Sequence, residues 1–198
     1  MPNYRDHPPG RAMRRQRGTS LIEVLVTLVI VAFGLLGVAA FQAKAQVGSV
    51  ESYQRAQAVI LLEDMTNRIS ANGAGADGYI SASVGTGDAQ PASCAEVAAG
   101  AARDLCEWSN ALKGAAEADA SGTRVGAMIG ARGCITRLVA ADASTGVCRP
   151  AVYQVSVAWQ GLHQTKAPSL TCGRTLYGNE TYRRAVGARV TISLPACS

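Results

Sequence analysis

The residues with the clearest chemistry are six cysteines, all in the second half or near the middle of the chain: Cys94, Cys106, Cys134, Cys148, Cys172 and Cys197. An even number confined to one part of a chain is typical of disulfides formed in an oxidising compartment. No Cys-x-x-Cys occurs and His163 is the only histidine nearby, so a zinc site is not favoured. Fifteen pairings are possible. We predict the sequential one, because each pair closes a local loop: Cys94–Cys106, Cys134–Cys148 and Cys172–Cys197.

Catalytic residues do not form any recognisable constellation. The sequence has no Gly-x-Ser-x-Gly, no His-Glu-x-x-His and no phosphate-binding glycine loop, and of its two histidines His7 lies near the N-terminus and His163 stands alone. We therefore expect a protein that is not an enzyme and that needs no cofactor or metal.

The N-terminal part has a fixed order of chemical features. A basic stretch ends at Gly18, the polar Thr19 and Ser20 follow, and one carboxylate sits at Glu23 before an uncharged run over residues 24–43. About 20 apolar residues in a helix cross a hydrocarbon core of roughly 30 Å. Because arginines precede the run, we expect the short N-terminal end to stay in the cytoplasm and the remainder to be exported. No small-x-small cleavage site closes a short apolar core, which argues against an ordinary secretory signal.

Glu23 has two interpretations. It could complete a capping box with Ser20, which lies three residues earlier. Alternatively, cleavage after Gly18 would give Thr19 a free amine and make Glu23 the fifth residue of the mature chain. Its carboxylate could then neutralise an amine of its own chain or of a neighbour, which would explain a charge at the edge of a membrane helix.

The segment Arg-Gly-Thr-Ser-Leu-Ile-Glu-Val at residues 17–24 resembles the class III prepilin signal of type IV pilins and pseudopilins. In that family the prepilin peptidase cuts after the glycine, here Gly18, and methylates the new N-terminus, here Thr19. Thr19 departs from the Phe or Met usual at this position. Met13 is an alternative start to Met1, and the sequence does not choose between them.

The charge of the whole chain gives no case for nucleic-acid binding. The net charge is +5, but residues 1–18 hold five arginines and one aspartate, so they contribute +4 and leave +1 for the mature chain. The one notable basic cluster, Arg183, Arg184 and Arg189, reads as a solvated strand edge. No specific nucleic acid is therefore expected as a partner.

Periodicity predicts an α+β fold with a long N-terminal helix and a C-terminal antiparallel sheet, which is also what the pilin resemblance implies. Residues 1–18 are expected to be a leader, 19–71 one helix that spans the membrane over about 21–43, and 72–198 a disulfide-linked periplasmic head. Glu51 with Arg55 and Asp64 with Arg68 are spaced for ion pairs along this helix.

Within the head, residues 94–120 are helical in composition, with Leu105, Trp108 and Leu112 on one face. Alternating apolar residues predict strands over 153–160 and 186–194, with further strands at 134–140 and 79–84. Residues 161–184 are expected to be a disulfide-tied loop.

Later features resemble PilV-type minor pilins: Cys-Glu-Trp at residues 106–108 with Leu112, the 153–159 strand, and Tyr-Arg-Arg at 182–184 before the last strand. The resemblance implies a subunit that initiates pilus assembly at the tip and supports adhesion or twitching motility. It would move from the inner membrane, as a single-pass protein, into the pilus. Expected partners are the prepilin peptidase, other minor and major pilins, the inner-membrane assembly machinery and membrane lipid. The alternatives are a type II secretion pseudopilin and a tip-located module that binds surfaces or DNA.

Overall fold

The computed structural model describes residues 18, 20–114, 120–121 and 128–194. The chain divides into two compact units, residues 1–45 and residues 46–198. Helix α1 (Leu21–Ala71) contributes to both units and ends at Ala71, the residue where the sequence predicts its end. The Asn-Gly that follows breaks the helix, since glycine and asparagine disfavour its continuation.

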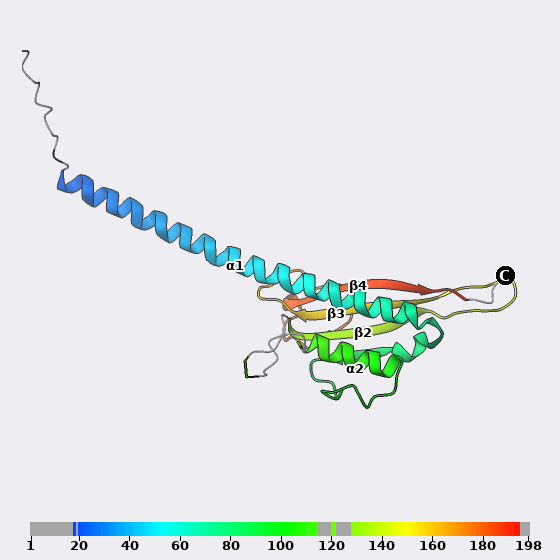
Figure 1. Cartoon of the computed structure of the whole chain (residues 1–198). Coiled ribbons are helices and arrows are strands. Elements are labelled where there is room, and N and C mark those ends of the chain that lie inside the picture. The colour runs from blue at the N-terminus through cyan, green and yellow to red at the C-terminus, as the bar shows by residue number, and fades with distance from the viewer. Residues whose placement is uncertain (1–17, 19, 115–119, 122–127, 195–198) are drawn as a thin grey trace, which may run out of the picture. The chain divides into compact units, whose positions relative to one another are not determined.

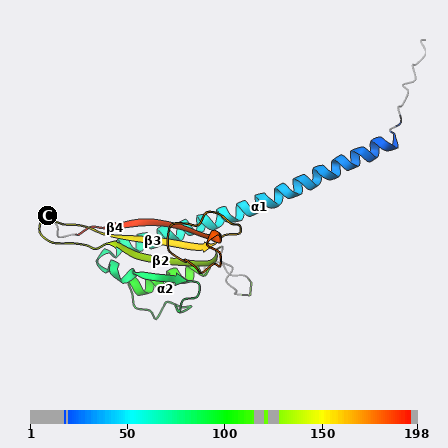
Figure 2. The same ribbon diagram turned by 180° about the vertical axis from the view of Figure 1, so that it is seen from behind.

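The second unit contains a four-stranded antiparallel sheet in the order β1-β2-β3-β4. Its strands are β1 (Ser81–Gly85), β2 (Ile129–Val139), β3 (Ala151–Gln160) and β4 (Arg183–Ile192). Two 3₁₀ helices, η1 (Gly73–Tyr79) and η2 (Glu180–Tyr182), and helix α2 (Ala101–Leu112) complete the head. Figures 1 and 2 show β2, β3 and β4 side by side. The α+β fold with a long N-terminal helix and an antiparallel sheet is thus confirmed.

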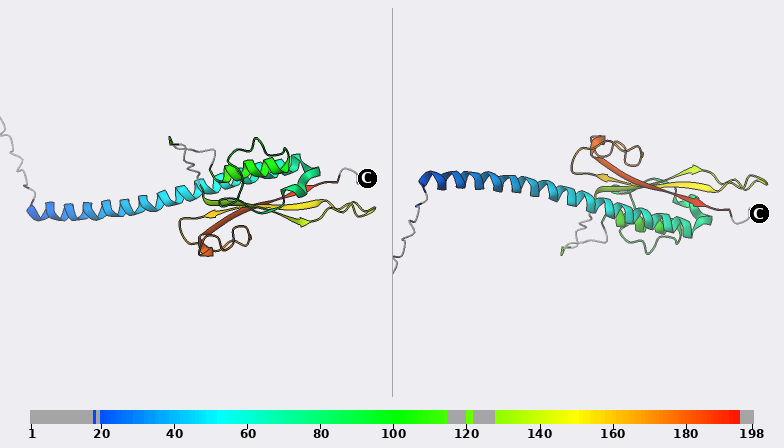
Figure 3. Two further views of the ribbon diagram at one scale, coloured as in Figure 1. Left: turned by 90° about the horizontal axis from the view of Figure 1, so that it is seen from below. Right: turned by 90° about the horizontal axis from the view of Figure 1, so that it is seen from above.

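The core of the head lies between the helices and one face of the sheet, which we call the inner face. From α1 it receives Ala58, Leu62, Met65 and Ile69, all buried, which recur at helical spacing. From β3 it receives every second residue, namely Tyr153, Val155, Val157 and Trp159. Figure 3 shows α2 and the adjoining part of α1 on this side of the sheet.

Trp108 of α2 is fully buried at the centre of this core, and its indole N–H donates to the Leu61 carbonyl at 2.8 Å. Leu112 is also buried and Leu105 packs beside it, so the predicted apolar face of this helix is confirmed. The opposing residue on β2 is Gly133, and its lack of a side chain makes room for the indole ring.

Several predicted boundaries were wrong. The predicted helix over 94–120 is shorter, because Gly100 before it and Gly114 after it have left-handed backbone angles (φ +97° and +81°) that helices do not continue through. Residues 115–119 of that prediction lie outside the described residues. Tyr79 belongs to η1 and not to the first strand. Strand β2 begins at Ile129, five residues before the predicted start, because its two glycines hide the alternation.

The loop over residues 161–182 crosses the other face of the sheet, which we call the outer face. Cys172 is bonded there to Cys134 of β2, and the single hydroxyl proton of Tyr177 is shared between the Gly130 and Ala158 carbonyls, whose oxygens lie 2.8 and 3.1 Å from the hydroxyl oxygen. Burial raises the pKa of Tyr177 to about 12, so this phenol stays protonated and keeps donating. Figure 3 shows this loop on the side of the sheet opposite α2.

Candidate processing and assembly segment

Gly18 is exposed, and a side chain added at this position would meet no atom within 4 Å. The described residues therefore give no steric reason for glycine here, which leaves room for a requirement from outside the fold, for example from an enzyme that binds this segment. Thr19, the second predicted processing residue, lies outside the described residues.

Glu23 lies in the first turn of α1. Its backbone N–H and that of Val24 donate to the Ser20 carbonyl at 3.0 and 3.3 Å, which places Ser20 at the N-cap position. The Glu23 side chain is exposed and makes no ion pair with any residue in the described part of the chain. Near the helix N-terminus a carboxylate is favourable through the helix dipole alone, yet it keeps the capacity to accept further donors.

The part of α1 in the first unit is apolar on all sides. Its large side chains are 44% to 89% exposed: Leu21, Ile22, Val24, Leu25, Val26, Leu28, Val29, Ile30, Val31, Phe33, Leu35, Leu36, Val38 and Phe41. By length and composition α1 could cross a membrane, and none of its most apolar stretch is buried in the chain itself. A helix that is apolar all round needs lipid or other helices as its surroundings.

Glu51 joins α1 to the end of the sheet in the second unit. One oxygen, Oε1, accepts from the Leu162 amide at 2.9 Å and from Arg184 at 3.1 Å, and it lies 2.9 Å from Nδ1 of His163. Burial opposes the charge of Glu51, but the Leu162 amide, Arg184 and His163 outweigh it and hold the pKa of this carboxyl below its usual range. The predicted pairing of Glu51 with Arg55 is therefore wrong, because Arg184 takes that place.

Arg68 joins α1 to α2 through three carboxylates. It bonds Asp64 at 3.0 Å, as its spacing predicts, and also Asp104 at 2.8 Å and Glu107 at 2.7 Å. Burial disfavours the charged guanidinium, but hydrogen bonds to Glu107, Asp104 and Asp64 raise its pKa overall. Three carboxylates around one guanidinium leave this cluster with an excess of two negative charges.

The predicted solvated strand edge holds for Arg189, which is exposed on the edge strand β4, but not for Arg183 and Arg184, whose side chains are mostly buried. Arg183 is 1% exposed, where it pairs with Glu180 at 2.6 Å and donates to the Leu170 and Cys172 carbonyls. It therefore organises the 161–182 loop. The alternation pattern alone could not show this, because the partner carbonyls come from a segment without periodicity.

The disulfides agree with the prediction in one pair only. Cys94 is bonded to Cys106, as predicted, but Cys134 is bonded to Cys172, so the predicted Cys134–Cys148 and Cys172–Cys197 pairs are wrong. The reason is the path of the 161–182 loop, which returns across β3 and brings Cys172 over β2. Cys148 is also disulfide-bonded, and Cys197 lies outside the described residues.

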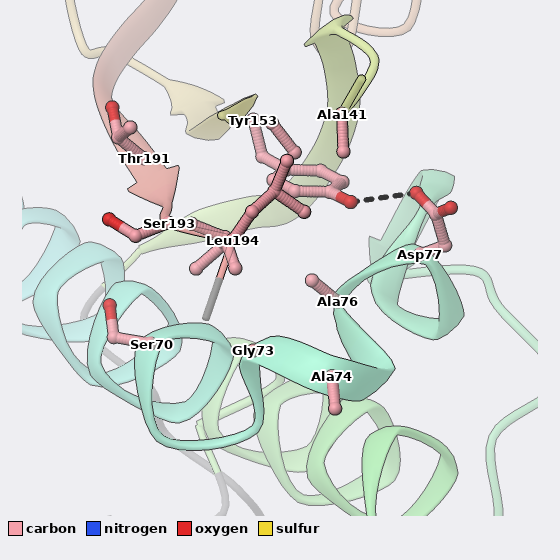
Figure 4. A pocket seen from close by; sticks show the side chains of 12 residues that line it. Ser70, Gly73, Ala74, Ala76, Asp77, Ala141, Tyr153, Thr191, Ser193 and Leu194 are labelled. Carbon is pink, nitrogen blue, oxygen red and sulfur yellow. Dashed lines mark hydrogen bonds between the residues drawn. The ribbon is translucent and has the colours of Figure 1, made fainter. Parts of the chain in front are cut away.

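A groove of about 510 Å³ lies beside the end of α1. Small side chains form much of its lining, and Tyr153, Ile192 and Leu194 form its larger walls. Figure 4 shows the Tyr153 hydroxyl pointing at Asp77, to which it donates at 2.7 Å. That hydrogen bond and Arg137 hold the pKa of Asp77 below its usual range, so the carboxylate is ionised and already paired. The described residues contain no group of His, Cys, Asp or Glu side chains placed to hold a metal ion.

Comparison with known proteins finds similarity in the N-terminal segment. Residues 13–39 match the family model described as the prokaryotic N-terminal methylation motif, and this range includes Gly18, Thr19 and Glu23. No curated protein and no solved structure shows significant similarity to the chain. The matched motif is a prepilin-type signal, which implies processing by prepilin peptidase and association with pilins. It supports a membrane-anchored, type IV pilin-like or pseudopilin-like subunit.

Proposed function

We propose that this chain is a minor pilin, PilV-like, that helps to initiate assembly of a type IV pilus at its tip. It would thereby support adhesion or twitching motility, as a structural subunit without catalytic activity. In this proposal residues 1–18 are the leader, residues 19–71 the anchoring and assembly helix, and residues 72–198 the periplasmic head.

One observation carries the proposal: a prepilin-type signal is followed directly by a helix whose apolar surface has no cover in its own chain. An ordinary soluble domain would leave such a surface exposed to water at a cost of about 25 cal/mol for each Å². A subunit that is first held in the membrane and then packed among other helices buries this apolar surface in both states.

The first step of the proposed mechanism is cleavage after Gly18 by the prepilin peptidase and methylation of Thr19. This removes the arginines that hold the N-terminus at the cytoplasmic side and creates a positive amine. The chain is then a single-pass inner-membrane protein with its head in the periplasm.

The second step is transfer from lipid to the fibre by the inner-membrane assembly machinery. Helix α1 loses lipid contacts and gains contacts with the helices of major and minor pilins, so its transfer costs little hydrophobic energy. Glu23 has no ion-pair partner among the described residues, and it would pair with the amine of a neighbouring subunit and thus favour one register.

The test is the intact mass and N-terminal sequence of the protein isolated from membranes, with and without the prepilin peptidase. A chain beginning at Thr19, with or without one methyl group, supports the proposal. A chain that retains its leader in the presence of the peptidase, or is cut after the apolar run, contradicts it.

A type II secretion pseudopilin is the alternative within the same class, since it uses the same signal. Deletion separates the two: loss of surface pili supports the pilus subunit, whereas loss of secreted enzymes with normal pili supports the pseudopilin. A tip-located module that binds surfaces or DNA is a further candidate role of the head.

A further inference from the structure

Charge is divided unevenly between two parts of the head. Residues 46–114, which hold the helices and β1, contain eight acidic and four basic residues, a net charge of −4. Residues 128–194, which hold β2, β3, β4 and the 161–182 loop, contain two acidic and eight basic residues, a net charge of +6. A near-neutral mature chain thus carries two strongly charged regions of opposite sign.

Three cations of the positive region are exposed on the outer side of the sheet, whereas Arg137, Arg149, Arg183 and Arg184 are in ion pairs within the molecule. Arg189 lies between Ala188 and Val190, which both point to the core, so its own side chain is on the outer face and is exposed. Lys166 and Arg174 are exposed on the loop that crosses this face. None of these three cations makes an ion pair within the described residues, whereas the one acid of that loop, Glu180, is paired with Arg183.

The negative region lies on the helices at the inner face. Its centre is the Arg68 cluster, where Asp64 and Glu107 keep 40% and 43% of their side-chain surface exposed. Two cations of the positive region pair with the negative region inside the molecule, Arg184 with Glu51 and Arg137 with Asp77. The outer face and the Arg68 cluster, in contrast, lie on opposite sides of the sheet (Figure 3), so they cannot meet within one molecule.

We propose that the outer face of the sheet, through Lys166, Arg174 and Arg189, binds the Arg68 carboxylate cluster of a second copy of this chain. A contact between unlike faces is heterologous, and it can be repeated along a fibre without closing into a two-fold dimer. Contact between two outer faces would bring like charges together and is disfavoured. This contact belongs to the head, so it does not depend on the processing of Gly18.

Photo-crosslinking of the full chain in membranes tests this contact. A benzophenone amino acid at Thr191, which is exposed two residues beyond Arg189 on the same face, would react with whatever covers the outer face. The expected product is a dimer of this chain in which peptide mapping joins position 191 to the segments that contain Asp64 or Glu107.

Charge reversal gives the matched comparison. Arg174→Glu with Arg189→Glu should lower the dimer yield roughly tenfold, and mixing these copies with Glu107→Lys copies should restore part of it. Arg55→Glu, at an exposed arginine of α1 outside both surfaces, should leave the yield unchanged. If Glu107→Lys fails to fold, Glu63→Lys, beside Asp64 on α1, replaces it.

Three results would overturn the proposal. They are a crosslink between two outer faces, a yield that the reversals do not change, and crosslinks to other proteins without any dimer of this chain.

Discussion

Glu51 of α1 and Arg184 of β4 form an ion pair at 3.1 Å, across 133 positions of sequence. The pair is mostly buried, with 18% and 14% of the two side chains exposed. It links the helix to the last strand just where the 161–182 loop leaves the sheet, because the same carboxylate accepts the Leu162 amide. Glu51 therefore connects three segments of the head that are distant in sequence.

Glu51→Gln should destabilise the head by about 1–3 kcal/mol at neutral pH, since it removes the charge from several hydrogen bonds at once. The pKa of Glu51 is lower in the folded chain than its usual 4.5, so its stabilisation is present above that value and is lost as the pH falls through the folded pKa. Urea unfolding at several pH values measures this. The difference in unfolding free energy between wild type and Glu51→Gln should shrink as the pH is lowered.

The matched control for this charge is Glu63→Gln, an exposed carboxylate of α1 that makes no ion pair within the described residues. It should change the unfolding free energy by less than about 0.5 kcal/mol at every pH. If the difference in unfolding free energy between wild type and Glu51→Gln stays constant with pH, the loss comes from the changed packing and hydrogen bonding of the side chain and not from its charge.

Gly133→Ala should destabilise the head by overpacking its core. An added Cβ would lie 2.1 Å from the Trp108 ring, and both residues are held inside the fold. The expected cost is about 1–3 kcal/mol. Combining it with Trp108→Phe should cost less than the sum of the two changes, because the smaller ring makes room for the methyl group. Gly48→Ala, where an added Cβ meets no atom within 4 Å, is the control. Additive losses would contradict the proposed clash.

The long helix, its end at Ala71 and the strand around Tyr153 could be predicted from sequence because each follows a local rule of periodicity or helix breaking. The connection of Cys134 with Cys172 could not, since it depends on how a loop without periodicity folds back over the sheet. The same holds for Glu51, whose partners come from two segments more than 100 residues away. In the processing segment, the roles of Gly18 and Glu23 stay predictions from sequence; they depend on the order of residues along the chain, which the motif match at residues 13–39 supports, and not on the tertiary structure.

Gly18→Val should leave the precursor uncut. The fold offers room for a valine here, so the change should not affect the stability of the head. The measurement is the size of the protein in membranes by immunoblot, compared with Gly48→Val as a control at another open glycine. A mature-sized Gly18→Val band would contradict cleavage at this site.

Glu23→Ala should permit cleavage but reduce incorporation into pili, because it removes the carboxylate proposed to pair with a neighbour's amine. Glu23→Asp tests the charge separately and should retain part of the incorporation. The unfolding free energy of the head should be the same in wild type, Glu23→Ala and Glu23→Asp, since Glu23 makes no ion pair with the described part of the chain. The measurement is the amount of this chain in purified pilus fractions, determined by immunoblot. Undiminished incorporation of Glu23→Ala would contradict the proposed charge pairing.

Removing the Cys134–Cys172 disulfide should cost more stability than removing Cys94–Cys106. The first closes a loop of 38 residues and the second a loop of 12, and in the chain-entropy model this difference is worth about 1 kcal/mol. The comparison uses paired Cys→Ala variants, unfolded by urea under oxidising conditions.

The order of the two losses also has a structural cause beyond loop length. The Cys134–Cys172 bond fixes the 161–182 loop to the outer face, where Ala158 and Tyr177 pack beside it, whereas Cys94–Cys106 fixes a short segment before α2. A larger loss from the Cys94–Cys106 variant would show that the segment before α2, and not the loop on the outer face, limits the stability of the head.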